Sequence, residues 1–485
     1  MNRVLATCLI GSFSLVVSGC MVGPKYVKPS APTALAYKEA PPESFKESDG
    51  WKQAQPADQK IRGKWWELFG DTQLNALEEE LTVSNQDLKV DESRLRQARA
   101  MIRFNRASEF PTISTSPSVA NERLSPNQPY FPPQYANNGT GAFTLPFDLS
   151  YEVDLWGRVR RTVSAAREEA QATAADLQTA SLSLHSELAY DYFELRSADA
   201  QKQLLDDTVK DYTDALQLTQ NRFDGGAAPK SDVAQAKTQL DGAQVQDTDV
   251  TVMRAQYEHA IATLIGKPPA EFSITFAPQT PLNLPVVPVG LPATLLERRP
   301  DIAAGERRMA EANDQIGIAR AAFYPTLMLN ASAGFEATTL ANLFTWPSRM
   351  WAAGPQMSQT LFDAGRRRAV SESATASYDG TVASYRQTTL TAFQEVEDNL
   401  AALRILESET QQQQEATASA AEALQLFTNR YQGGVDNYLQ VITAQTVLLN
   451  NERNDIDIKR RRMDASVLLI KAIGGGWDTT QLPKY

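Results

Sequence analysis

The sequence predicts a mainly α-helical protein with a smaller membrane β-part, assembled from two copies of one structural unit. Three patterns support this prediction. Several motifs recur at a nearly constant offset, a stretch of eleven residues alternates between apolar and polar side chains, and two runs of 66 and 67 residues contain no proline and at most one glycine. Recurring motifs indicate a duplicated unit, alternation indicates strands, and long uninterrupted runs indicate helices.

The first twenty residues have the features of a bacterial lipoprotein signal. Arg3 precedes the apolar segment Val4 to Val17, which is too short to span a membrane as a helix. The segment ends in Val17-Ser18-Gly19-Cys20, which resembles a lipobox, in which cleavage leaves a cysteine that carries the lipid. We therefore expect residues 1–19 to be a signal peptide and Cys20 to be lipidated. The alternative is an ordinary signal peptide with a chance cysteine.

Composition excludes some classes of protein. The formal net charge is −11, and no Lys/Arg cluster stands clear of compensating acids, so a nucleic-acid-binding surface is not expected. Cys8 lies within the expected signal peptide, so the mature chain would keep only Cys20. No disulfide within one chain is therefore expected.

The recurring motifs identify a tandem duplication. The segments 98–113 and 312–327 match, with Pro111 and Pro325 at an offset of 214. Three further pairs of motifs share an offset of 208. They are Gly157-Arg158 with Gly365-Arg366, Arg222 to Gly226 with Arg430 to Gly434, and Ile265-Gly266 with Ile473-Gly474. We expect a lipidated extended segment over 20–70, a first copy over 71–266, a linker over 267–293, a second copy over 294–474 and a tail over 475–485.

Each copy is expected to contribute two strands. Phe143, Leu145, Phe147, Leu149, Tyr151 and Val153 alternate with mostly polar residues, as in a strand with one face in lipid and one in water. A weaker alternation covers 327–335, and the duplication places the other two strands over 112–122 and 350–362. The segments 126–141 and 336–348 are expected to be exposed loops. The edge of a soluble β-sandwich is the alternative.

The remaining residues are expected to be helical. The first long run, from Arg158 to Phe223, has its counterpart from Arg366 to Gln432, which contains only Gly380. Each run ends in a Gly-Gly pair suited to closing a helix and reversing the chain. Shorter helices are expected over 232–265, 294–322 and 438–473. Each long helix would stand beside a stacked pair of short ones, so the sequence predicts a tall helical cylinder.

The strand count predicts an oligomer. Four strands cannot close a membrane barrel, and open strand edges are not tolerated in lipid. Two chains would give eight strands and an interior filled by side chains, whereas three chains give twelve strands and room for a pore. A trimer is therefore expected.

Six motifs are spread over nearly the whole mature chain. They are Cys20-Met-Val-Gly-Pro-Lys-Tyr-Val-Lys-Pro29, Trp65-Trp66-Glu-Leu-Phe-Gly-Asp71, Arg299-Pro300-Asp301-Ile302 with Glu306, Ala322-Phe-Tyr-Pro325, Arg430-Tyr-Gln-Gly-Gly434 and Gly474-Gly-Gly-Trp477. With these motifs the chain resembles the TolC-like outer-membrane efflux proteins, and within them the lipoprotein (NodT-type) branch that serves resistance-nodulation-division (RND) pumps.

The resemblance implies a fold, a function and partners. It implies a homotrimer whose twelve-stranded outer-membrane barrel continues into a long periplasmic α-helical barrel. The helical end would dock a periplasmic adaptor (a membrane fusion protein) and an inner-membrane RND transporter. Such a protein is a passive conduit for drugs and other toxic small molecules, with no enzymatic activity and no cofactor. Met21 is not the aspartate that favours inner-membrane retention, which agrees with outer-membrane sorting.

The resemblance also implies roles at the hairpin tips. Gly225, Gly226, Gly433 and Gly434 would lie at the adaptor-docking surface. Asp232 and Tyr431 stand where the family links neighbouring hairpins to hold the aperture shut. The sequence departs from the family at Asp436, where a basic latch residue can stand, and at Gln440 and Thr443, where aperture acids are common. Leu439 remains as an apolar constriction. Ordinary helix-turn chemistry is the alternative for all of these residues.

The same residues bear on three other functions. A duct for type I protein or peptide secretion would share this architecture. A periplasmic adaptor would have one helical hairpin rather than two. An enzyme is disfavoured, because His185 and His259 are each isolated within a helix and neither a metal cluster nor a catalytic triad is apparent.

Overall fold

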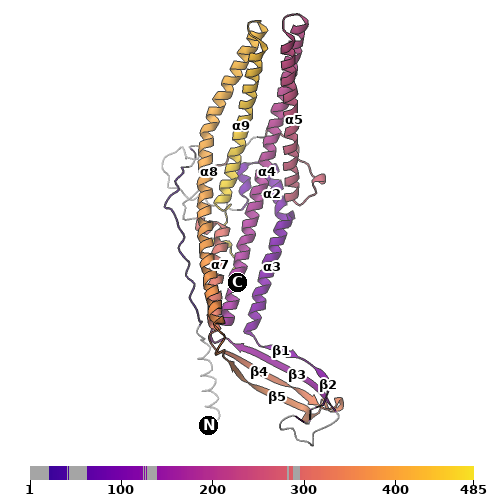
Figure 1. Ribbon diagram of the computed structural model, residues 1–485, viewed down its shortest axis with the longest axis vertical. Coiled ribbons are helices and arrows are strands. Elements are labelled where there is room, and N and C mark those ends of the chain that lie inside the picture. The colour runs from indigo at the N-terminus through magenta and orange to yellow at the C-terminus, as the bar shows by residue number, and fades with distance from the viewer. Residues whose placement is uncertain are drawn as a thin grey trace.

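The computed structural model describes residues 21–40, 42, 63–123, 125, 127, 139–280, 283–287 and 295–485. These residues form a tall bundle of helices that stands on one end of a slanting β-sheet (Figure 1). Two helical hairpins project from the bundle at the end opposite the sheet. The expected signal peptide and Cys20 lie outside the described residues.

The strands of the described residues form one antiparallel sheet. Its segments are β1 (Thr112–Thr115), β2 (Ser118–Glu122), β3 (Thr140–Val153), β4 (Thr326–Ala337) and β5 (Arg349–Ser358). β1 and β2 pair with β3 in a single register, since Thr115 lies opposite Phe147 and Ser118 lies opposite Thr144. They are one strand interrupted at Pro117, which has no N–H for the ladder. The sheet is therefore four strands wide, as the duplication predicts.

Three strand boundaries differ from the prediction. β3 begins at Thr140, so Thr140 and Gly141 lie in a strand although the sequence predicts a loop over 126–141. The sequence predicts a last strand over 350–362, whereas β5 ends at Ser358. Glu336 and Ala337, in a predicted loop, extend β4. Glu336 pairs with Thr144 of β3, and Ala337 pairs with Phe143. β4 therefore continues as far as it pairs with the longer strand β3.

The register gathers apolar side chains on one face of the sheet. Between β3 and β4, Leu149 lies opposite Ala331, Tyr151 opposite Leu329, and Val153 opposite Leu327. The residues of β5 on the same face are Trp351, Ala353, Pro355 and Met357. The other face carries a polar ladder in which Ser150 Oγ donates to Asn330 Oδ1 (3.2 Å) and Asn330 Nδ2 donates to Gln356 Oε1 (3.1 Å). The sheet thus has one face suited to lipid and one suited to water.

The two copies contain helices of equal length. α4 (Arg158–Asp224) and α8 (Arg366–Gln432) each have 67 residues, and α5 (Lys230–Leu264) and α9 (Tyr438–Ala472) each have 35. The long helices begin after Gly157 and Gly365, both in the left-handed conformation. Among the described residues, no helix combines the length and the apolar character that crossing a membrane requires.

The remaining helices add detail to the prediction and correct it at two points. α2 (Thr72–Ser84) and α3 (Gln86–Arg106) lie where the sequence predicts helical structure without giving its bounds. The helix predicted over 294–322 is divided into α6 (Leu295–Arg298) and α7 (Pro300–Ala321), because proline favours extended geometry at the preceding residue. Short 3-10 turns are η3 (Trp65–Phe69), η4 (Ala107–Glu109), η6 (Pro269–Glu271), η8 (Leu340–Asn342), η9 (Trp346–Ser348) and η10 (Thr479–Gln481). η3 lies in the segment predicted to be extended.

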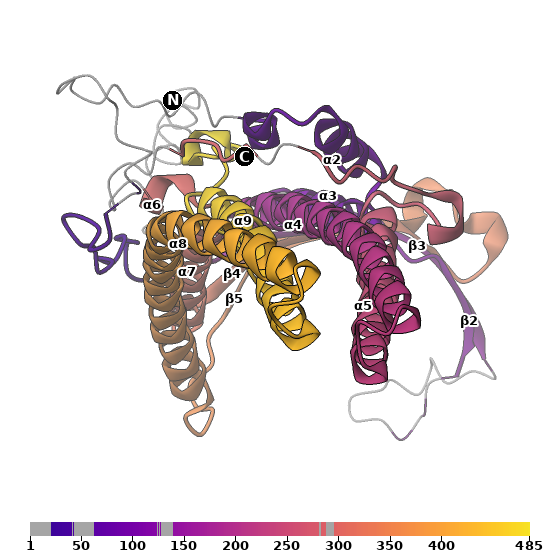
Figure 2. The ribbon, with the colours of Figure 1, turned by 90° about the horizontal axis from the view of Figure 1, so that it is seen from above.

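The central element of the packing is α4, which contacts α3, α5, α7 and α9, whereas α8 packs against α7 and α9. The largest apolar cluster surrounds the middle of α4 and includes Leu188, Leu195, Ile261 of α5 and Ile470 of α9. Seen from above, the helices trace an arc, with α2 and the last residues of the chain on its convex side (Figure 2). One chain therefore resembles a section of a cylinder wall.

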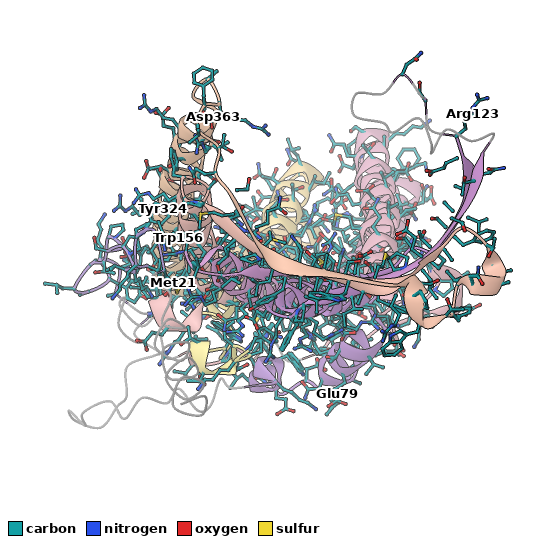
Figure 3. The ribbon with its side chains drawn as sticks, turned by 90° about the horizontal axis from the view of Figure 1, so that it is seen from below. Met21, Glu79, Arg123, Trp156, Tyr324 and Asp363 are labelled. Atoms are coloured by element: carbon teal, nitrogen blue, oxygen red, sulfur yellow. The ribbon has the colours of Figure 1, made fainter. Side chains whose placement is uncertain are left out.

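Residues 21–40, here called the N-terminal segment, run from the strand–helix junction toward the middle of the bundle (Figure 1). At the junction, Met21 lies near Trp156 and Tyr324 (Figure 3). The rings of Trp156 and Tyr324 stack with their centroids 4.6 Å apart. At the upper end, the backbone N–H groups of Lys38 and Glu39 donate to the carboxylate of Glu397 on α8, over 2.7 and 2.9 Å. The segment therefore connects the base of the bundle to its middle.

Candidate aperture and docking site

The hairpin tips close with the same backbone turn in both copies. At the first tip, Ala227 N–H donates to Arg222 O (2.7 Å) and Gly226 N–H donates to Phe223 O (2.9 Å). Val435, Gly434, Arg430 and Tyr431 repeat this pair of bonds at the second tip, over 2.9 and 3.0 Å. This is the Schellman arrangement that ends helices at a left-handed residue.

The four glycines of the tips divide into two roles. Gly225 and Gly433 have negative φ, whereas Gly226 and Gly434 both have φ of 73°. A Cβ at Gly226 or Gly434 would meet nothing within 4 Å. Glycine is therefore favoured at these two positions by the backbone conformation, and the space around each one is open.

Two of the predicted aperture residues belong to a buried cluster just below the turns. Tyr431 and Tyr438 pack with ring centroids 5.1 Å apart, together with Val441 and with Ala236 of the first hairpin. Asp232, in the first turn of α5, is also buried. Burial raises the pKa of Tyr438 to about 12, and the negative charge of Asp232 acts in the same direction. The structure thus places Tyr431 where the two hairpins of one chain meet.

Asp436 is paired within its own hairpin. The Arg430 guanidinium donates to both carboxylate oxygens of Asp436, from Nε over 2.6 Å and from Nη2 over 3.1 Å. These bonds hold the pKa of Asp436 below its ordinary value. The charge of Asp436 is therefore balanced by Arg430 beside the second turn.

The other predicted aperture residues lie on the outside of α9. Leu439, Gln440 and Thr443 are exposed, and Thr443 Oγ1 donates to the backbone oxygen of Leu439 (2.9 Å). This surface is uncharged at the three positions. It is separate from the buried tyrosine cluster.

Arg222 is a residue of this site that the sequence patterns did not predict, although it lies in one of the duplicated motifs. Arg222 Nη1 donates to Gln432 O at the end of α8 (3.0 Å), and its guanidinium carbon lies 4.6 Å from the centroid of the Tyr431 ring. The side chain thus crosses from the first hairpin to the second. One feature of the sequence distinguishes Arg222 from Arg430: the position that matches Asp436 in the first copy is Ala228, so Arg222 has no acidic partner there.

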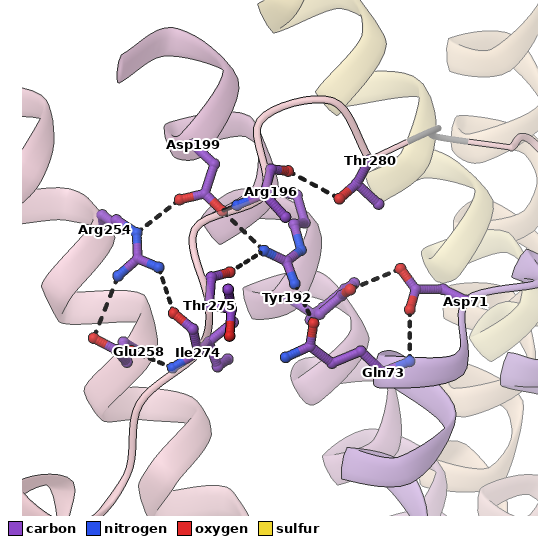
Figure 4. Close-up of polar contacts among 11 residues, drawn as sticks. Asp71, Gln73, Tyr192, Arg196, Asp199, Arg254, Glu258, Ile274, Thr275 and Thr280 are labelled. Atoms are coloured by element: carbon purple, nitrogen blue, oxygen red, sulfur yellow. Dashed lines mark hydrogen bonds and ion pairs between the residues drawn. The ribbon is translucent and has the colours of Figure 1, made fainter. Parts of the chain in front are cut away.

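A polar cluster connects the middle of α4 to α5 and to the loop that follows α5 (Figure 4). Asp199 accepts from Arg196 Nη1 (2.9 Å), from Arg254 Nε (2.7 Å) and from the Ala277 N–H (3.1 Å). The two arginines also donate to the backbone oxygens of Thr275 and Ile274. α4, α5 and the loop that follows α5 are therefore joined through one buried carboxylate.

His185 is not isolated, contrary to the prediction. Its Nδ1 lies 2.6 Å from Oε2 of Glu78 on α2, both side chains are buried, and the ring of Trp66 stacks on the imidazole at 4.5 Å. Burial raises the pKa of Glu78 well above its ordinary value and lowers that of His185 to about 4. We infer a protonated Glu78 that donates to a neutral His185.

This pair does not have the arrangement of a catalytic triad. Thr82 Oγ1 lies 3.4 Å from His185 Nε2, but its hydroxyl donates to the backbone oxygen of Glu78 (3.0 Å). The hydroxyl proton is therefore not offered to the imidazole. The pair acts as a buried connection between α2 and α4.

The Glu78–His185 pair predicts a specific dependence of stability on pH. In the unfolded chain Glu78 titrates near pH 4.5 and His185 near pH 6.5. Between these values each state holds one proton, so the contribution of the pair is constant. Above pH 6.5 only the folded state holds a proton, so stability falls as pH rises, by about 1.4 kcal/mol per unit, until folded Glu78 deprotonates.

The Glu78→Gln variant should reverse this profile. Its amide still donates to His185 but does not titrate, so its stability is constant above pH 6.5 and falls between pH 6.5 and about 4 as the unfolded histidine gains a proton. The thermal midpoint of each protein, followed by circular dichroism from pH 5 to 9, measures the difference. Glu79→Gln, at an exposed neighbouring position, should follow the parent. A pH-independent difference between Glu78→Gln and the parent would contradict the assignment.

The comparisons with known proteins agree with this architecture. The family model described as "Outer membrane efflux protein" matches residues 77–267 and 291–475, one segment in each copy. The toluene efflux pump outer membrane protein TtgF of Pseudomonas putida is 32% identical over 472 residues, covering 96% of both chains. The outer-membrane channel OprN has 28% identity and a TM-score of 0.83, covering 94% of this chain and 100% of that one. The CmeC outer membrane channel of Campylobacter jejuni has 25% identity and a TM-score of 0.87, covering 95% and 96%.

Proposed function

Because this chain belongs to the outer membrane efflux protein family, and is therefore an outer-membrane channel of an efflux system, we propose that it works as a homotrimer in a tripartite assembly. Its partners in this proposal are a periplasmic adaptor of the membrane fusion protein class and an inner-membrane RND transporter. The transporter supplies the energy, and the channel is a passive conduit without a cofactor.

The observation that carries the proposal is the position of the hairpin tips at the end of the molecule opposite the sheet (Figure 1). The apolar face of the sheet suits one end to the outer membrane. A helix of 67 residues is about 100 Å long at 1.5 Å per residue, so the tips would lie deep in the periplasm. An adaptor that meets the channel there would contact the turns at Gly225, Gly226, Gly433 and Gly434.

The edges of the sheet support the proposed trimer. Among the residues that the structure describes, β1/β2 and β5 each have a neighbouring strand on one side only. Unpaired edges are not tolerated in lipid. Three copies with four strands each would close into a barrel of twelve strands, which has room for a pore.

We propose that a lipid on Cys20 adds a second membrane attachment. The next residues support this, because the Val22 N–H donates to Trp156 O (3.0 Å) at the strand–helix junction. A lipid attached directly before Met21 would lie near the membrane surface. The mass of the mature N-terminal peptide, compared with that of the Cys20→Ala variant, measures the acyl groups.

The substrate class is proposed from the relatives. Proteins named for the efflux of toluene, solvents and antibiotics cover nearly the full length of this chain. We propose that this channel likewise passes small, largely apolar organic molecules. A wide conduit need not bind its cargo, so selection would lie with the pump.

The Gly434→Asp variant tests docking at the tips. It adds a charge in open space at a left-handed residue, where aspartate is better tolerated than most residues, so trimers should form as in the parent. Export of a fluorescent efflux substrate by cells with the adaptor and pump should fall by an order of magnitude or more, since a charge would be buried at the docking surface.

The matched control is Gly63→Asp, which has a φ of 90° and open space but lies far from the tips. It should export like the parent. Loss of trimers in Gly434→Asp would assign the turn to the fold, and normal export by intact Gly434→Asp trimers would contradict docking at this turn. A parent that is monomeric in detergent and forms no pores would contradict the proposed trimeric channel.

A further inference from the structure

One face of α3 carries a row of arginines that runs down to the sheet. This arginine row consists of Arg96, Arg99, Arg103 and Arg106, all exposed. Intervals of three, four and three residues place the four side chains on one face of a helix. Arg99 Nε donates to the hydroxyl of Tyr485 (2.8 Å), and the last residues of the chain lie on the convex side of the arc (Figure 2). The arginine row therefore faces the outside of the cylinder wall.

The duplicate of this face, on α7, has the same orientation. At the offset of 214, Arg103 matches Gly317. The N-terminal segment covers this face of α7, since Asn313 Nδ2 donates to Pro24 O (3.3 Å) and a Cβ on Gly23 would lie 2.6 Å from Cα of Gly317. In the first copy Arg103 is exposed instead. The outer face of α3 is thus open to another molecule at the place where the outer face of α7 is covered by the chain itself.

The lower end of the arginine row lies beside the membrane surface. α3 ends at Arg106, next to the sheet (Figure 1), and β1 begins at Thr112. Between them, Phe110 is 61% exposed, and its duplicate Tyr324 is 41% exposed. Exposed aromatic side chains at the ends of membrane strands are typical of the membrane–water interface. Arg106 thus lies one helical turn from the interface, on its helical side.

The two lowest arginines of the row are available to an anion. Among the described residues, no acidic side chain pairs with Arg103. The nearest acid to Arg106 is Glu109, at 3.6 Å, and the Arg106 side chain is 61% exposed. Such a pair contributes little in water. Arg103 lies about 4.5 Å above Arg106 at 1.5 Å per residue, and a head-group layer is about 5–8 Å thick, so both guanidinium groups can reach one layer.

The exposed apolar side chains of α3 lie in a different row. They are Val90, Met101 and Phe104, at intervals of eleven and three residues. Phe104 follows Arg103 directly, so the two side chains point about 100° apart around the helix. The apolar row suits contact with the neighbouring chain in the proposed trimer. The arginine row would therefore stay accessible after assembly.

We propose that Arg103 and Arg106 bind the head groups of anionic phospholipids in the periplasmic leaflet of the outer membrane. Guanidinium groups bind phosphate oxygens through paired, charge-assisted hydrogen bonds, and anionic lipids attract cations that lie next to the membrane. A lipid fits this place better than a soluble anion does, because the site continues directly from the apolar face of the sheet. This inference goes beyond the proposed conduit and needs neither adaptor nor pump. It rests only on the proposed orientation, with the helices in the periplasm.

Native mass spectrometry of the purified protein tests the lipid site. The probes are phosphatidylglycerol, which is anionic, and phosphatidylethanolamine with the same acyl chains, which has no net charge. The parent should bind phosphatidylglycerol about 25-fold more tightly, at about fivefold for each of the two arginines. The double variant Arg103→Gln/Arg106→Gln should bind both lipids alike, with its affinity for phosphatidylethanolamine unchanged. Each single variant should lose about fivefold, which decides the question if the double variant does not fold.

Two further double variants separate position from charge. Arg103→Lys/Arg106→Lys keeps both charges and should retain most of the preference. Arg94→Gln/Arg461→Gln removes two other exposed cations, one on another face of α3 and one on α9, and should bind lipids like the parent. Equal losses in this control and in Arg103→Gln/Arg106→Gln would assign the preference to net charge and overturn the site.

The test also separates the lipid site from the proposed trimer, because the site lies within one chain. A parent that binds both lipids equally would overturn the lipid site and leave the trimeric channel standing, as would a preference that survives in Arg103→Gln/Arg106→Gln. A monomeric parent that prefers phosphatidylglycerol, and loses the preference in that variant, would contradict the trimer and support the lipid site.

Discussion

Replacing Asp199 by asparagine is expected to destabilise the protein by about 3–5 kcal/mol, because it removes the carboxylate that pairs with the buried Arg196 and with the partly buried Arg254. Asp199 is fully buried, and it accepts from the guanidinium groups of Arg196 and Arg254. The side chain of Arg196 is 2% exposed, so water cannot replace the lost carboxylate. Asparagine keeps the shape of the site while removing the charge.

The expected damage extends beyond the ion pairs. Asp199 also accepts from the Ala277 N–H, and the two arginines bind the oxygens of Thr275 and Ile274 (Figure 4). These contacts fix the start of the linker against α4 and α5. In Asp199→Asn this loop should become accessible to proteases before the protein unfolds as a whole.

The control for this variant lies seven residues along the same helix. Asp206 forms an exposed pair with Lys202, with its side chain 47% accessible, so Asp206→Asn should change stability by less than about 0.5 kcal/mol. Thermal midpoints of both variants in the same detergent give the comparison. Equal midpoints for Asp199→Asn and Asp206→Asn would show that the Asp199 carboxylate does not hold this cluster together.

The features that the sequence predicts well are those fixed by local pattern. The alternation over 143–153 predicts β3 as a strand with one apolar face, because successive side chains of a strand point to opposite faces. The run from Arg158 to Phe223 predicts α4 to within one residue, because it has no breaker before Gly225. Duplication then carries both predictions to the second copy.

The features that it misses depend on contacts between distant residues. Glu78 and His185 are separated by 107 positions, and no local signal links an acid on α2 to an imidazole on α4. Arg222 and Gln432 are separated by 210 positions. The division at Pro300 is different, because a local signal was present: proline favours extended geometry at the preceding residue, and the single helix over 294–322 was expected from the length needed beside the long helix.

Replacing Gly317 by alanine is expected to weaken the attachment of the N-terminal segment and to lower stability by about 3 kcal/mol. A Cβ at Gly317 on α7 would lie 2.2 Å from Cδ of Arg161, so that side chain must move. Arg161 is buried against Asp314 (2.7 Å), and it donates to the backbone oxygens of Val22 (2.8 Å) and Pro24 (3.0 Å). Displacement of one arginine thus breaks an ion pair and removes two of the hydrogen bonds that hold the segment.

The Gly380→Ala variant, at a glycine inside another helix, is expected to change stability in the opposite direction. Nothing lies within 4 Å of a Cβ at Gly380 on α8, so alanine should stabilise the protein by up to about 1 kcal/mol through helix propensity. The same gain applies at Gly317, where the clash with Arg161 outweighs it. Thermal midpoints should therefore shift in opposite directions, and trypsin should cut after Lys25 faster in Gly317→Ala than in Gly380→Ala. Equal midpoints and equal cleavage would mean that Arg161 adapts without releasing the segment.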